Sequence, residues 1–172
     1  MLPILLLCAI GGGFQQQEGL LPPWESKTVL TNAQKQIRAV SDSLGKLDTR
    51  TWKGDYQPLL VSTRQRVVAV ADAVNRMSDK PESLSLGVEA FLSMQQVEGN
   101  IESLARGAER FQPSAGASLD SASNSFQEVK EQFQNYLLEL SRYLEKNLAV
   151  ASKDLESCRD QMWKRPGAKK ND

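Results

Sequence analysis

Apolar residues recur alternately three and four positions apart along four long stretches of this chain. Such spacing puts them on one face of an α-helix, and its regular alternation is the heptad pattern of helices that pack against each other. The stretches cover residues 24–47, 55–77, 80–111 and 114–165. The sequence therefore predicts an all-α protein: an antiparallel four-helix bundle over residues 24–165, with a long C-terminal helix and coiled-coil-like heptad seams.

The predicted core consists of the apolar stripes of these four helices. Aromatic residues make up 6% of the chain, a composition that suits aliphatic helix seams better than a β-sandwich. The stripe residues are Leu30, Ala33, Ile37, Val40, Leu44 and Leu47; Tyr56, Leu60, Thr63, Val67, Val70, Val74 and Met77; Gly87, Ala90, Met94, Val97, Ile101, Leu104, Ala108 and Phe111; and Leu119, Ala122, Phe126, Val129, Phe133, Tyr136, Leu140, Leu144, Leu148, Ala151, Leu155, Cys158 and Met162.

Polar residues predict where the later helices begin. Asp55 is a good N-cap for the second helix. Asp79 followed by Glu82 resembles a capping box for the third helix. The fourth helix has two candidate starts, Ser114 after the break at 112–116 and a second capping box at Ser125.

The connection between the first two helices runs from Gly45 to Gly54. Gly45 is a plausible stop for the first helix, because glycine weakens helices and is common just past their ends. Trp52 lies in this connection, and we expect it to cover one end of the bundle. In the third helix, Gly87, Gly99 and Gly107 are positions at which a neighbour would be able to approach closely.

The fourth helix is too long for its partners. At 1.5 Å per residue it spans roughly 60–75 Å, against about 30–35 Å for each of the first two helices. Two extra four-residue steps also shift its stripe by one residue near Leu144, which unwinds a supercoil locally. Either the C-terminal third of the fourth helix projects from the bundle, or the first two helices lie along different halves of the hairpin that the third and fourth helices form. The shift favours the second arrangement and predicts that the helix changes packing partner or straightens near Leu144.

The N-terminus carries an apolar run, Leu2 to Ile10, followed by three glycines. The run is too short for a membrane span and fits the apolar region of a signal peptide, although no Lys or Arg precedes it. We predict a signal peptide over 1–13 and a linker over 14–23, and hence an extracytoplasmic protein, periplasmic or secreted. Two alternatives stay open: a lipoprotein through Cys8, for which Leu7 is too large, and a retained segment that packs on the bundle.

The C-terminus offers two further features. Residues 166–172 form a predicted basic flexible tail, whose charges complement the end of the last helix. The alternative is that these basic residues contact a membrane surface or an anionic partner. Cys158 falls on the apolar stripe of the fourth helix, which predicts a buried thiol. The alternative is an intermolecular disulfide, which an oxidising compartment would allow.

The chain has no histidine and 21 basic against 21 acidic residues. Without histidine, Ser-His-Asp and Cys-His catalysis lack their base, and histidine zinc sites are excluded. Neutral charge gives no general attraction to nucleic acid. We therefore predict no enzyme, no cofactor and no metal. Glu98, beside the seam of the third helix, is expected to keep its carboxylate in water.

These observations favour an exported helical-bundle interaction or scaffold protein of the cell envelope. It would bind a protein partner or a second copy of itself through an apolar helix face. The predicted face is Leu148, Leu155, Met162 and Trp163, on the part of the fourth helix that exceeds its neighbours. The alternative is an extracytoplasmic, sensor-like ligand-binding bundle, with an apolar pocket left by the small residues of the third helix.

Overall fold

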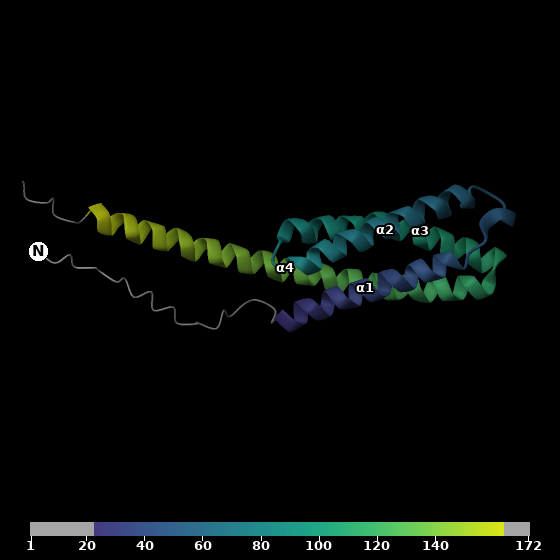
Figure 1. Cartoon of the computed structure of the whole chain (residues 1–172), viewed down its shortest axis with the longest axis horizontal. Coiled ribbons are helices and arrows are strands. Elements are labelled where there is room, and N and C mark those ends of the chain that lie inside the picture. Colours follow the sequence, from purple (N-terminus) through teal and green to yellow (C-terminus); the bar gives the residue numbers. More distant parts are fainter. Residues whose placement is uncertain (1–22, 164–172) are drawn as a thin grey trace, which may run out of the picture.

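The computed structural model describes residues 23–163, which form four α-helices and one short 3₁₀ helix. The elements are α1 (Pro23–Gly45), η1 (Thr49–Thr51), α2 (Tyr56–Asp79), α3 (Leu84–Phe111) and α4 (Pro113–Trp163). Consecutive helices run antiparallel, and α1 and α3 each pack against both α2 and α4 (Figure 1). The predicted all-α four-helix bundle is therefore confirmed. The predicted signal peptide, the basic tail and all of the linker except Pro23 lie outside the described residues.

The apolar stripes form the core, as the heptad spacing predicts. From Leu30 to Leu140, the stripe residues are buried, apart from the half-buried Tyr56 and Phe111. Thr63, the polar member of the stripes, is fully buried, and its hydroxyl donates to the carbonyl oxygen of Leu59 at 2.7 Å. That bond satisfies a hydroxyl that would otherwise be costly to bury.

An aromatic cluster closes the end of the bundle at the α1–α2 connection. Trp52 is buried and stacks on Phe111, with ring centroids 5.6 Å apart, while Tyr56 meets it edge-on at 5.3 Å. The cluster leaves no room for a side chain at Gly107, where a Cβ would lie 2.5 Å from the Tyr56 ring. Trp52 thus covers a bundle end as predicted, and Gly107 permits the close approach.

Gly87 also permits a close approach of its neighbours, at the opposite end of the bundle. A Cβ there would overlap Leu137 Cδ2 and would lie 3.2 Å from Met77 Cε. Leu137 and Met77 therefore fill the space that the missing side chain leaves. Near this site the Tyr136 hydroxyl donates to the carbonyl oxygen of Pro81 in the α2–α3 turn, which ties α4 to that turn.

The helix boundaries confirm some signals and correct one. α1 ends at Gly45, and α2 follows Asp55, although the Asp55 side chain makes no capping bond. The capping box at Asp79 is wrong, because Asp79 is the last residue of α2 and α3 begins only after Ser83. The Ser83 amide bonds the carbonyl of Lys80 at 3.0 Å, closing a turn whose second residue is proline, a favoured position for it.

α4 begins at Pro113 and runs for 51 residues. The structure thus supports the start near Ser114 rather than the one at Ser125. Proline suits the first helical position, because its missing N–H would have no intrahelical partner there.

The excess length of α4 projects from the bundle. Leu140 is the last buried residue of α4, and every side chain described from Leu144 onward is exposed. Figure 1 shows the helix leaving the bundle beside the α2–α3 turn and the beginning of α1. The predicted arrangement with α1 and α2 along different halves of the α3–α4 hairpin is wrong. Both α1 and α3 pack on the first half of α4, so near Leu144 the packing ends instead of changing partner.

Glu98 corrects another expectation. Its carboxylate is not left in water but pairs with the Lys130 ammonium of α4, and each side chain is less than one-fifth exposed. Beside this pair the Gln127 amide donates to the Glu102 carboxylate at 3.0 Å. These bonds join α3 to α4 within the bundle. The projecting part of α4 has no described helix beside it with which to form such bonds.

Candidate interaction surface

The projecting part of α4, residues 141–163, is here called the α4 extension. It is about 34 Å long at the rise of an α-helix. Its amino end adjoins the bundle, where Leu140 is still packed, and its body contacts no other described helix (Figure 1). Within residues 23–163, the α4 extension is therefore a single helix that no other helix covers along most of its length.

An apolar stripe runs along this helix. Leu148 and Leu155 are each 72% exposed, and Leu144 is also exposed. Ala151 and Cys158 continue the same row and are exposed as well. The steps of four, three, four and three residues keep all five on one face. We call this row the extension stripe. The spacing matches the buried seams of the bundle, but here no described helix covers it.

The direction of the stripe follows from the heptad. Leu144, Ala151 and Cys158 lie seven, fourteen and twenty-one residues after Leu137. In a straight α-helix such positions drift by only about 20° per heptad. Leu137 packs on Gly87, at the end of the α2–α3 hairpin. The extension stripe therefore faces the space directly beyond the α2–α3 turn.

The structure describes the side chains of three of the four residues predicted as a binding face, and all three are exposed. Leu148 and Leu155 lie on the extension stripe and are exposed. Trp163 is 83% exposed, but it follows Met162 by one residue and is turned about 100° from it, so it lies beside the stripe. The Met162 side chain is outside the described residues.

Two features of the extension differ from the sequence prediction or escaped it. Cys158 is an exposed free thiol, so the prediction of a buried thiol is wrong. Cys158 occupies an apolar stripe as expected, but it lies on a part of α4 that extends beyond the ends of the other three helices. Val150 is 53% exposed on a different face, and no periodicity singled it out because it is isolated there.

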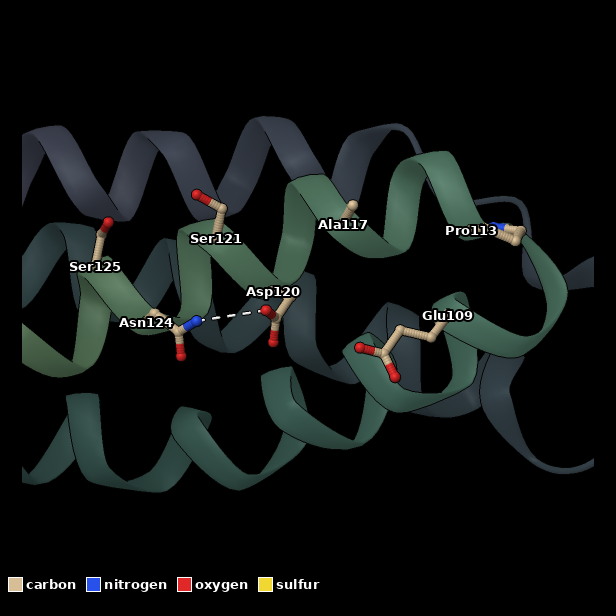
Figure 2. A pocket seen from close by; sticks show the side chains of 7 residues that line it. All are labelled: Glu109, Pro113, Ala117, Asp120, Ser121, Asn124 and Ser125. Atoms are coloured by element: carbon tan, nitrogen blue, oxygen red, sulfur yellow. Dashed lines mark hydrogen bonds between the residues drawn. The ribbon is translucent and has the colours of Figure 1, made fainter.

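The described surface also has a shallow recess between α3 and α4, near the turn that joins them. It is lined by Glu109, Pro113, Ala117, Asp120, Ser121, Asn124 and Ser125. Figure 2 shows Asp120 and Asn124 on the side of α4 that is nearest Glu109, with Asn124 donating to Asp120 at 3.4 Å. The lining consists of small and polar residues, which is not the apolar pocket expected of the ligand-binding alternative.

That apolar pocket was expected beside the small residues of α3. The space next to Gly87 and Gly107 is filled instead by Leu137, Met77, Tyr56 and Trp52. Among residues 23–163, no group of three metal-ligating side chains is gathered at one place. No helix in the described range is both long and apolar enough to cross a membrane.

Comparison with known proteins found no matching family model, no matching curated protein and no matching solved structure.

Proposed function

We propose that this protein is a helical-bundle interaction or scaffold module that binds through the α4 extension. One observation carries the proposal: the extension continues the heptad pattern of a packed seam while its leucines stay in water. Burying a leucine side chain is worth roughly 1.5–3 kcal/mol, so covering this row favours association. Exposed apolar rows of this kind mark interaction surfaces.

The bundle explains how such a surface would be ready to bind. An isolated helix of this length is marginal in water, because nucleation of the first turn is costly. The α4 extension needs no nucleation of its own, since it continues a helix whose first half is held in the core. A partner would therefore meet a preformed helix, and the ordering cost of binding would be small.

The proposal includes an extracytoplasmic location in the cell envelope. It rests on the apolar run at 2–10 and the glycines after it, which are typical of a signal peptide. Mass spectrometry of the native protein tests this part. We expect an N-terminus near Phe14, and an intact Met1 would contradict it. A lipid on Cys8 would support the lipoprotein alternative instead.

We further propose that the module has no enzymatic activity. The lack of histidine removes the commonest catalytic base from the whole chain, which supports this view. The ligand-binding alternative gains no specific observation from the described residues. The space beside Gly87 and Gly107 is filled, and Gly99 is exposed with no atom within 4 Å of a Cβ placed there, so no neighbour approaches it closely.

The binding proposal is tested by affinity capture from the native source with charged variants. Leu148→Asp and Leu155→Asp place a carboxylate on the extension stripe, whereas Val150→Asp adds the same charge on another exposed face. All three should fold like the wild type, because these side chains are in water. We expect the stripe variants to lose captured chains, including second copies, and the Val150 variant to retain them. Equal capture by all three would contradict the proposal.

A further inference from the structure

The α2–α3 turn limits which partner helices can pack on the extension stripe. The stripe continues the row of Leu137, which packs against the end of the α2–α3 hairpin, and Tyr136 bonds Pro81 in the turn itself. A helix lying on the stripe would therefore meet this turn at its bundle-side end. The partner helix fits on the stripe only if it ends at this turn. The stripe therefore requires a partner helix with a free end and about 34 Å of uncovered length.

We propose that the occupant is the α4 extension of a second copy, lying antiparallel. This inference rests on the proposed function and names its partner. The extension has the required features: it projects from its own bundle, and within residues 23–163 no other element packs on its far end. Its length equals that of the stripe it would cover. The dimer is a two-helix coiled coil with one bundle at each end.

The residues fit this register layer by layer. Setting the two-fold axis at Lys153 places Leu148 of one copy against Cys158 of the other, and Ala151 against Leu155. Each leucine thus meets a smaller side chain, which lets the helices approach closely and interdigitate. The same layers recur on the other side of the axis by symmetry, so Leu148 and Leu155 of both copies are covered.

The flanking charges also agree with the antiparallel register. Glu145 of one copy lies beside Arg159 of the other, and the symmetry repeats this pair. Both side chains are exposed in the single chain, so they are accessible to pair across an interface. The register has one unfavourable position: Asp154 lies beside Asp154 of the second copy. Like charges so placed weaken a helix pair.

A parallel pair fits less well. The second chain would continue into its own bundle at the level of the first bundle, in the space that the α2–α3 turn occupies. It would also stack Leu148 on Leu148 and Ala151 on Ala151, which alternates crowded and empty layers. In its favour, Asp154 would meet Arg159, and Cys158 would meet Cys158. These differences make the orientation measurable.

Disulfide trapping in the full chain tests the orientation. All variants carry Cys8→Ser, and two versions are made: one keeps Cys158, and the other carries Leu148→Cys with Cys158→Ser. Under mild oxidation we expect each version alone to stay uncrosslinked and their mixture to form a crosslinked heterodimer. Crosslinking of each version alone would show the parallel pair and overturn the proposal.

Asp154→Asn gives a second test whose sign depends on orientation. In the antiparallel dimer it removes a repulsion between exposed like charges, so sedimentation should show the dissociation constant falling about two-fold. A rise would contradict the antiparallel register, because it would mean that an Asp154–Arg159 attraction had been lost. Both side chains are exposed in the single chain, so the folded bundle should be unaffected.

The remaining outcomes separate this inference from the proposed function. If the full chain sediments as a monomer at every concentration, the second-copy proposal is wrong. If the stripe then captures a different protein, the proposed function stands and only its partner changes. If deletion of residues 1–22 turns a monomer into a dimer, the chain's own N-terminal segment covers the stripe, which also overturns the inference.

Discussion

The two parts of α4 carry the same kind of pattern and meet different surroundings. In residues 113–140 the heptad positions hold residues such as Phe126 and Phe133, which are buried under α1 and α3. In residues 141–163 the same spacing holds Leu148 and Leu155, which are exposed. The comparison teaches that periodicity states which face of a helix is apolar, whereas neighbours decide whether that face is covered.

Cavity-forming substitutions should separate the two parts most strongly. Phe133→Ala removes a fully buried ring and should lower the free energy of unfolding by about 3–5 kcal/mol. Leu155→Ala should change the unfolding of the bundle by at most about 0.5 kcal/mol, because its side chain is in water. Chemical denaturation of dilute protein measures both. Similar losses would mean that the extension belongs to the folding core.

A charge substitution gives a smaller contrast. Lys130→Ala leaves the Glu98 carboxylate partly buried without its ammonium and should cost about 1–2 kcal/mol, between the values for exposed and buried pairs. The matched control is Lys153→Ala in the extension, where the side chain is exposed and little change is expected. Denaturation midpoints at equal protein concentration measure both losses of stability. A loss for Lys153→Ala as large as that for Lys130→Ala would contradict the difference between the bundle and the extension.

Tyr136 and Tyr143 offer a tyrosine pair across the boundary. Tyr136→Phe loses the bond to Pro81 and should cost about 0.5–1.5 kcal/mol, whereas Tyr143→Phe should cost less. Thermal unfolding at neutral pH measures the difference. A greater cost at Tyr143 would place the boundary of the bundle beyond Leu140.

The pH dependence of stability gives a further test of Tyr136. Burial, with a smaller contribution from Glu82, raises the pKa of Tyr136 from 10.0 to about 12. The folded state therefore holds this proton more tightly than the unfolded state. Its contribution to stability is complete below pH 10 and is lost as the pH rises toward 12. Tyr136→Phe should flatten the fall in stability over this range relative to wild type, and an unchanged slope would contradict the assignment.

The sequence predicts the bundle well because its evidence is local and repeated. Each of Leu30, Val67, Met94 and Phe133 is one of many stripe positions, and burial of these rows is the largest favourable term in folding. The sequence does not locate the start of α3, because Asp79 and Glu82 fit a capping box equally well whether or not α2 continues to Asp79. Only the turn around Pro81 decides between the two.

The fate of the extension lies beyond local evidence. The phase shift near Leu144 marks a change in packing, and the sequence alone does not tell a new partner from none. Cys158 illustrates the result: its position on the stripe was predicted, but its burial depended on helices that stop short of it. Helix lengths carry the missing signal, since the 23 residues of α1 and the 28 of α3 leave part of the 51-residue α4 without cover.

Amide hydrogen exchange at two protein concentrations tests the central claim most directly. The amides of residues 115–140 should be protected equally at both concentrations, because the bundle core holds them. Those of residues 141–163 should exchange fast in dilute protein and become protected as the concentration rises, and Leu155→Asp should abolish the gain. Protection of the extension that is independent of concentration and unchanged in this variant would contradict the account.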